Sequence, residues 1–186
     1  MTPEAAKSLL LSSQCVADIE EIDHALSDMA NKINLRFAES NPVILAVMTG
    51  AMVFAGQLLP RLSFPMEIDY LQVNRYGKNL TGGTICWRIE PQINLHGRSV
   101  LIIDDVLDEG ITLDAACKKA FSLGASEVLT AVFINKQINT AKAIQADFIG
   151  IELPDRFLFG FGLDASGYWR NLPCIYAMAS NQNKDP

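Results

Sequence analysis

Hydrophobic residues recur every three or four positions in several stretches of the chain, and each such stretch predicts a helix with one buried face. The longest stretch covers residues 15–37 and ends before Asn41 and Pro42. Thr2 followed by Pro3 predicts the start of an earlier helix, because threonine caps helices and proline fits their first position. Further helices are predicted at residues 52–61, 113–123 and 140–145.

Short apolar runs alternate with these helices, and each run predicts a buried strand. The alternation indicates an α/β fold with a doubly wound, mainly parallel sheet flanked by helices, in a single domain over residues 1–186. Residues 75–84 carry three glycines and basic residues, which predicts a mobile loop or a hairpin arm. The predicted strands cover residues 43–47, 66–73, 100–103, 128–134 and 148–151.

Composition and charge exclude several classes of protein. The chain is 49% hydrophobic and 19% charged, as a packed globular domain is. No apolar run reaches the ~20 residues that span a bilayer, and the N-terminus lacks the basic start of a signal peptide, so we expect a cytoplasmic protein with no membrane partner. A net charge of −6 argues against nucleic acid as a partner. Four scattered cysteines disfavour both zinc and disulfides: Cys15, Cys86, Cys117 and Cys174.

The most informative segment is VLIIDDVLDEGIT, residues 100–112. Its apolar strand ends in two adjacent carboxylates, Asp104 and Asp105, and Asp108 follows. A turn containing Gly110 then opens into a helix, and the backbone N–H groups at such a turn and helix N-terminus suit a phosphate. Carboxylates beside a phosphate site fit a ligand that carries a phosphate together with hydroxyl groups or a divalent metal. A sugar phosphate with Mg²⁺ meets this description.

This motif resembles the phosphoribosyl-pyrophosphate signature of the type I phosphoribosyltransferases. Residues 147–157, 160–164 and 168–170 resemble the purine-pocket region of the hypoxanthine-guanine branch, and the likeness extends from about residue 16 to residue 178. The resemblance implies the type I phosphoribosyltransferase fold. That fold would have a core at about residues 40–150, a small hood from about residues 1–15 and 151–180, and a flexible loop over the site.

The resemblance implies that two acids meet the ribose hydroxyls, directly or through Mg²⁺. These acids are Asp104 and Asp105, and Asp164 would hold a second metal ion. For an isolated pair of aspartates, a solvated acidic turn is the alternative. The buried strand before the pair and the phosphate-type turn after it favour the metal and sugar role.

For the leaving pyrophosphate, the resemblance implies a contact with Thr49 and Gly50, which follow the first predicted strand. Relatives often carry a basic residue where this chain has Thr49, so Arg170 would supply the positive charge instead. A cis peptide bond would fall between Met48 and Thr49. Taken without the resemblance, Thr49 and Gly50 indicate an ordinary turn from a strand to a helix.

Residues 108–112 would cradle the 5-phosphate of the sugar, and here the chain departs from the family pattern. Glu109 stands where a small or hydroxylated residue is usual, and Ile111 replaces a residue that is often basic. Because a carboxylate repels a phosphate, we expect Glu109 to point outward. Binding would then depend on backbone amides, including that of Gly110, and on the Thr112 hydroxyl.

On the base side, the resemblance implies that Asp108 is the general base that takes the N7 proton of the purine. Lys136 would donate to the 6-oxo group, Phe157 would stack on the ring, and the Leu158 backbone would read the ring edge. Tyr76 belongs to the loop that would close over the site and exclude water. The alternatives are a turn aspartate for Asp108, a core aromatic for Phe157 and a flexible surface arm for the loop.

Together these residues predict a transferase that moves phosphoribosyl from its pyrophosphate to N9 of hypoxanthine or guanine, with Mg²⁺ as cofactor. Its partners would be these two small molecules, and relatives suggest a homodimer or homotetramer. A regulatory protein that senses nucleotides with the same fold is the first alternative. The second is a receiver-like α/β domain that uses its acids only for Mg²⁺, which leaves residues 147–170 unexplained.

Overall fold

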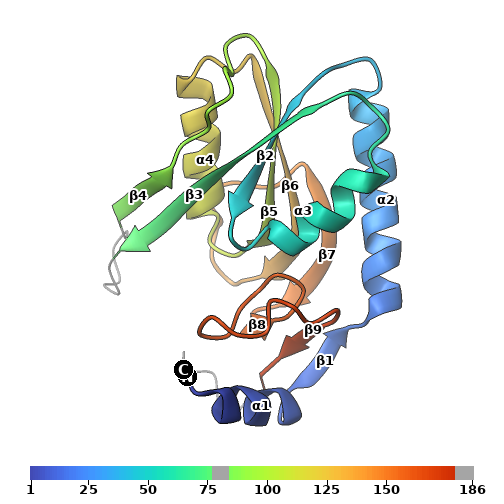
Figure 1. Ribbon diagram of the computed structural model, residues 1–186, viewed down its shortest axis with the longest axis vertical. Helices are drawn as coiled ribbons and strands as arrows, with labels where there is room; N and C mark the ends of the chain where they lie inside the picture. Colours follow the sequence, from blue (N-terminus) through green and yellow to red (C-terminus); the bar gives the residue numbers. More distant parts are fainter. Residues whose placement is uncertain (77–83, 179–186) are drawn as a thin grey trace.

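A six-stranded sheet forms the centre of the computed structural model, which describes residues 1–76 and 84–178 (Figure 1). The strand order is β4-β3-β2-β5-β6-β7, and every neighbouring pair is parallel except β3 and β4. The strands are β2 (Val43–Met48), β3 (Glu67–Tyr76), β4 (Thr84–Ile89), β5 (Ser99–Leu107), β6 (Glu127–Gln137) and β7 (Phe148–Pro154).

Helices cover both faces of this sheet, which confirms the doubly wound α/β fold (Figure 1). On one face lie α2 (Ile19–Phe37), α3 (Met52–Leu58) and the short 3-10 helix η1 (Leu59–Arg61). On the other face lies α4 (Ile111–Ser122). The strands β2 and β5 are apolar on both faces, because alternate residues of a strand point to opposite sides. Each face of the sheet therefore has its own buried core.

A separate antiparallel sheet of order β1-β9-β8 lies beyond the carboxyl ends of the parallel strands (Figure 1). Its strands are β1 (Gln14–Ala17), β8 (Leu158–Phe159) and β9 (Ile175–Ala177), and α1 (Pro3–Leu11) packs against it. Thr2 caps α1 as predicted, since its hydroxyl accepts a hydrogen bond from the Ala5 N–H at 3.2 Å. The Trp169 indole donates to the Ala6 carbonyl at 2.7 Å and ties α1 to the C-terminal segment.

The helix predicted at residues 15–37 begins later, at Ile19. Asp18 and Glu21 form a capping box, in which each side chain accepts a hydrogen bond from the other residue's backbone N–H. The residues before Asp18 form β1 instead and pair with β9. The helical spacing of hydrophobic residues did not separate this short strand from the helix that follows.

The helix predicted at residues 140–145 is wrong, since this segment has no helical structure. Its backbone instead packs on the turn between β5 and α4, where the Ala143 N–H donates to the Glu109 carbonyl at 2.9 Å. Strand β4 was missed. It pairs antiparallel with β3 as far as Tyr76 and Thr84, which is the arrangement of a hairpin arm. Residues 77–83 of the predicted arm lie outside the described residues.

Within the described ranges, no helix combines the length and the apolar character that a membrane crossing requires. The four cysteines carry free thiols. The parallel strands end on the side of the sheet that faces the small antiparallel sheet, and this is where ligands collect in open α/β sheets. The predicted site residues follow these strand ends.

Candidate active site

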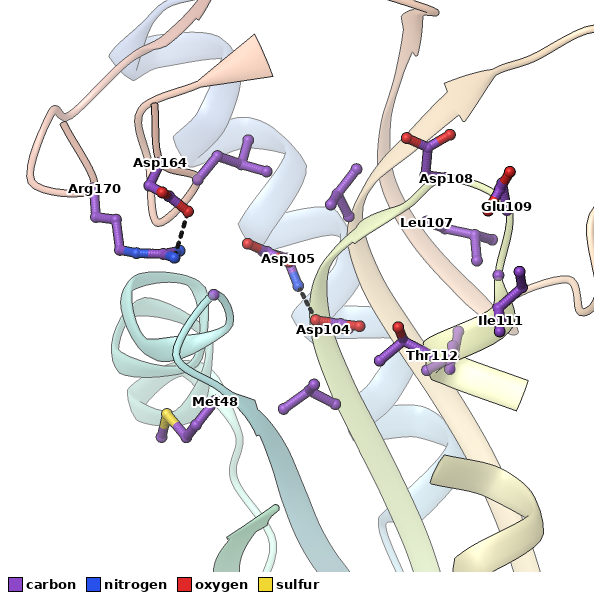
Figure 2. Close-up of a pocket in the computed structure, with 16 residues that line it drawn as sticks. Met48, Asp104, Asp105, Leu107, Asp108, Glu109, Ile111, Thr112, Asp164 and Arg170 are labelled. Carbon is purple, nitrogen blue, oxygen red and sulfur yellow. Dashed lines mark hydrogen bonds and ion pairs between the residues drawn. The ribbon is translucent and has the colours of Figure 1, made fainter. Parts of the chain in front are cut away.

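Strand β5 carries two carboxylates near its carboxyl end, of which the first is buried and the second partly buried. Asp104 is 7% exposed, and its Oδ1 accepts a hydrogen bond from the Asp105 N–H at 2.9 Å (Figure 2). Burial raises the pKa of Asp104 well above its ordinary value, and the neighbouring Asp105 charge raises it further. Burial also raises the pKa of Asp105, although the Arg170 charge partly opposes this shift. Two desolvated acids therefore lie side by side and are poised for a cation or for hydroxyl donors.

The turn after β2 lies directly against Asp105. A side chain at Gly50 would place its Cβ 2.2 Å from Asp105 Oδ2, so the Asp105 carboxylate keeps this position only beside a glycine. The peptide bond between Met48 and Thr49 is cis, as the sequence resemblance implied. The Thr49–Gly50 turn and the Asp105 carboxylate thus form one wall of the site.

The turn between β5 and α4 forms the opposite wall. Gly110 has a φ of 80°, a left-handed conformation that favours glycine, and α4 begins at the next residue. No side chain caps this helix, so its first N–H groups are available to an anion. Glu109 is exposed and lines the cavity, and in Figure 2 its carboxylate points away from Asp104 and Thr112.

These walls enclose a cavity of about 340 Å³ at the carboxyl ends of β2 and β5. Ten of the residues proposed from the sequence line it: Gly50, Asp104, Asp105, Asp108, Glu109, Gly110, Ile111, Thr112, Asp164 and Arg170. A cavity of this volume accommodates a sugar phosphate, because ligand pockets start at roughly 300 Å³. The sequence motif and the cavity therefore coincide.

Arg170 brings a positive charge to the side of the cavity that holds Asp105. Its guanidinium donates to the Gly162 carbonyl at 2.5 Å and forms an ion pair with Asp164 (Figure 2). Asp164 also accepts a hydrogen bond from the Gly167 N–H at 2.6 Å. These contacts hold the Arg170 side chain at the cavity, where its charge can attract an anion.

The donor set at the cavity fits a metal ion that arrives with its substrate. In the described part of the chain, no three or more acidic, histidine or cysteine side chains form a group that could hold a metal. Magnesium, however, is usually bound through one or two carboxylates together with substrate phosphates and water. Asp104 and Asp105, which are neighbours on β5 and both line the cavity, could supply these carboxylates.

On the far side of Asp108, opposite charges meet. The Lys136 ammonium lies 2.9 Å from Asp108 Oδ2 and 3.8 Å from Asp155 Oδ1. Lys136 is 14% exposed, whereas the Asp108 side chain is 50% exposed. A neighbouring cavity of about 300 Å³ is lined by Lys136, Asp155, Arg156 and Phe157. The proposed base and the proposed 6-oxo donor therefore bind one another beside a cavity with an aromatic wall.

Leu158, Thr49 and Tyr76 were also proposed from the sequence. Leu158 is buried in β8 and pairs with Ala177, so its side chain lines neither cavity. Thr49 lies next to Gly50 in the turn without lining the first cavity. The Tyr76 side chain lies outside the described residues. Sequence analysis assigned no role to Asp155, although its position two residues before Phe157 in the recognised segment could have drawn attention to it.

Comparison with known proteins agrees with this geometry. The family model described as a phosphoribosyl transferase domain matches residues 15–166. The chain therefore belongs to the phosphoribosyltransferases. Within that class, its relatives are hypoxanthine-guanine phosphoribosyltransferases, which places the chain in the hypoxanthine-guanine branch. The hypoxanthine-guanine phosphoribosyltransferase of Aquifex aeolicus is 31% identical over 159 residues, which cover 84% of this chain and 89% of that protein.

Other relatives support the same branch and the same fold. The Bacillus subtilis hypoxanthine-guanine phosphoribosyltransferase is 29% identical over 157 residues, which cover 84% of this chain and 87% of that protein. A crystal structure of a hypoxanthine-guanine phosphoribosyltransferase from Bacillus anthracis superimposes with a TM-score of 0.84 at 24% identity. That match covers 89% of this chain and 98% of the other, so the fold is shared over nearly the whole molecule.

Proposed function

We propose that this protein transfers the 5-phosphoribosyl group from phosphoribosyl pyrophosphate to N9 of hypoxanthine or guanine. The products would be IMP or GMP and pyrophosphate. The observation that carries the proposal is the position of the Lys136 and Asp108 pair at the end of the strand that also holds Asp104 and Asp105. One strand end thus joins a sugar-phosphate site to a site for a polar heterocycle.

The sugar would lie in the cavity between the Thr49–Gly50 turn and α4. Asp104 and Asp105 would accept hydrogen bonds from the ribose hydroxyls or hold Mg²⁺, and the N–H groups at the start of α4 with the Thr112 hydroxyl would bind the 5-phosphate. Arg170 would attract the pyrophosphate. Mg²⁺, held by Asp104 and Asp105 with a second ion near Asp164, would neutralise charge on the leaving pyrophosphate.

The base would insert between Lys136 and Asp108, next to Phe157. In a 6-oxopurine, O6 and N7 are neighbours on one edge of the ring. Lys136 would donate to O6 while Asp108 accepts the N7 proton as N9 attacks the sugar. The backbone of Leu158 would read the far edge of the ring. An adenine would place its 6-amino group against the Lys136 ammonium and leave that buried donor unpaired, which disfavours its binding.

Water must be kept from the activated sugar, and we assign that role to the arm that includes Tyr76. The proposed partners are the two small-molecule substrates, with further copies of the chain as a homodimer or homotetramer. Free thiols at all four cysteines support a reducing compartment, and we propose the cytoplasm. Nucleic-acid binding requires a basic surface, and the net charge of −6 argues against such a partner.

Direct assay of nucleotide formation tests the proposal. The protein is incubated with phosphoribosyl pyrophosphate, Mg²⁺ and one of hypoxanthine, guanine, xanthine or adenine, and nucleotide products are separated and quantified. We expect product with hypoxanthine or guanine, no product with adenine, and no product with chelator. Failure to form nucleotide from any 6-oxopurine would contradict the proposal. Sustained binding of nucleotide without turnover would instead favour a regulatory role.

A further inference from the structure

One partly buried ammonium group joins the ends of the two strands that lead to Asp108 and Lys136. Lys142 Nζ donates to the Leu107 carbonyl at 2.8 Å and to Asn135 Oδ1 at 2.6 Å. Leu107 and Asn135 are paired in register and form the last such pair between β5 and β6. They also directly precede Asp108 and Lys136 in the sequence. Lys142 therefore binds both strands at the point where they separate toward the site.

The surroundings of Lys142 hold its ammonium in place. Burial lowers the pKa of Lys142, and the charges of Asp108 and Glu152 oppose that shift. Glu152 in turn accepts hydrogen bonds from the Asn135 amide at 3.4 Å and from the Gln137 amide at 3.1 Å. A half-buried ammonium needs hydrogen-bond acceptors. The two short bonds to Leu107 and Asn135 therefore hold the Lys142 side chain in one position, whereas an exposed lysine samples many rotamers.

The backbone next to Lys142 supports the same turn from behind. The Ala143 N–H donates to the Glu109 carbonyl at 2.9 Å. The Ile144 backbone nitrogen lies so near Gly110 that an added Cβ there would approach it to 3.2 Å. Residues 138–146 thus form a backing for the turn between β5 and α4. Lys142 lines a third cavity, of about 560 Å³, together with Lys136, and it lines neither the cavity at Asp104 nor the cavity at Phe157.

We propose that Lys142 is a positioning residue, whose ammonium ties β5 to β6 and so sets the separation of Asp108 and Lys136 for the N7 and O6 edge of the purine. This inference rests on the proposed function. A small change in this separation should have a large effect on the rate, because displacing a reacting group by about 1 Å can lower the rate by roughly 10²-fold. The proposed phosphate turn is also held by the Ala143 N–H, which a change of the Lys142 side chain leaves in place, so the sugar-phosphate contacts should change little.

The Lys142→Met variant tests this division, because it keeps the length and the apolar stem of the side chain while removing the ammonium. We expect kcat with hypoxanthine or guanine to fall by about 10- to 100-fold, with KM for phosphoribosyl pyrophosphate within about twofold of wild type. Lys142→Arg, which keeps a cationic donor, should restore part of the loss. Lys118→Met serves as the matched control, since Lys118 is 76% exposed in an ion pair on α4 and should leave both parameters unchanged.

A second measurement separates positioning from general damage to the fold. If Lys142 acts mainly through Asp108, then Lys142→Met should cost much less in an Asp108→Asn background than in wild type. An equal loss in both backgrounds, or a parallel rise in KM for phosphoribosyl pyrophosphate, would overturn the positioning role. Should Lys142→Met fail to fold, Lys142→Gln, which keeps an N–H donor without the charge, is measured in the same way.

The controls also separate this inference from the function on which it rests. A wild-type protein that makes no nucleotide contradicts the proposed function. An active wild type together with a Lys142→Met variant of unchanged kcat contradicts only the role of Lys142. Thermal unfolding of each variant, with and without phosphoribosyl pyrophosphate and Mg²⁺, shows that the compared proteins are folded and that the sugar side still binds.

Discussion

The two halves of the candidate active site arrange their charges in opposite ways. On the sugar side, the buried Asp104 lies next to the partly buried Asp105, so that like charges meet in a desolvated place. On the base side, Lys136 contacts Asp108 at 2.9 Å, and opposite charges neutralise one another. The first arrangement is unfavourable until a cation or a set of hydroxyl donors arrives. The second is already favourable and must open for the purine.

This difference indicates how each half selects its ligand. The acids at the end of β5 favour a ligand that brings positive charge, which phosphoribosyl pyrophosphate does when it carries Mg²⁺. The pair of Lys136 and Asp108 favours a ligand that replaces both partners at once, with an acceptor facing the ammonium and a donor facing the carboxylate. A 6-oxopurine offers these two groups side by side. Substitutions in the two halves should therefore have different consequences.

Asp108→Asn should produce the largest effect on turnover, because it removes the proposed proton acceptor and leaves the sugar side unchanged. We expect kcat to fall by roughly 10²–10⁴-fold, with KM for phosphoribosyl pyrophosphate within about twofold of wild type. Steady-state kinetics with hypoxanthine and guanine measure both parameters. Asp23→Asn is the control, since Asp23 is 61% exposed and pairs with Arg61 on the distant α2 face. Normal turnover by Asp108→Asn would rule out the general base.

Asp104→Asn should make the metal-free protein more stable while it impairs turnover. The folded-state pKa of Asp104 is raised by burial, so unfolding releases a proton, and stability falls as pH rises from the ordinary value of 3.8 through the raised one. Asparagine removes this dependence. At pH 7 to 8 with chelator we expect Tm to rise by about 2–4 °C, which corresponds to roughly 1 kcal/mol in a domain of this size. The gain should shrink toward pH 4.

An exposed acid that accepts two short hydrogen bonds provides the contrasting control for that measurement. Asp147 Oδ2 accepts from both the Thr130 N–H and the Thr130 hydroxyl at 2.8 Å. Asp147→Asn should therefore lower Tm, in contrast to Asp104→Asn. Thermal unfolding followed by circular dichroism between pH 4 and pH 8 gives both values. A destabilised Asp104→Asn protein at neutral pH would mean that the two acids do not oppose each other as described.

The two halves also differ in how far the sequence predicted them. The sugar side comes largely from one contiguous segment, residues 100–112, so its strand, acids, glycine and helix could be predicted from local chemistry. The base side combines the ends of β5 and β6 with residues 155–157. The roles of Asp108, Lys136 and Phe157 were proposed only through the family resemblance. Spacing alone does not bring such distant segments together.

Elements that depend on contacts between distant segments were also not predicted, because their own sequence pattern does not specify these contacts. Strand β1 is defined by its pairing with β9, more than a hundred residues away, and not by its own pattern. Residues 140–145 carry helical spacing, yet their hydrogen bonds go to the turn between β5 and α4. Lys142 accordingly gave no signal in the sequence. In contrast, the capping box of Asp18 and Glu21 was a readable local signal for the start of α2.

Glu109→Gln should give the smallest effect, and it tests whether the sugar side carries more negative charge than phosphate binding favours. Glu109 is exposed at the turn that would hold the 5-phosphate, with its carboxylate directed away from Asp104 and Thr112 (Figure 2). Because water screens the repulsion to about 1 kcal/mol or less, removal of this charge should lower KM for phosphoribosyl pyrophosphate by roughly two- to fivefold, with kcat unchanged. Higher ionic strength should reduce the difference.

The control for this charge is Glu39→Gln, which removes an equally exposed carboxylate just before β2, at the opposite end of the sheet. It should leave KM unchanged. If Glu109→Gln instead raises KM, then the carboxylate supports substrate binding. The sugar side would in that case need the negative charge of Glu109 in addition to that of Asp104 and Asp105. A lowered KM would mean that only the buried acids of β5 serve the sugar, while Glu109 weakens the phosphate contact beside them.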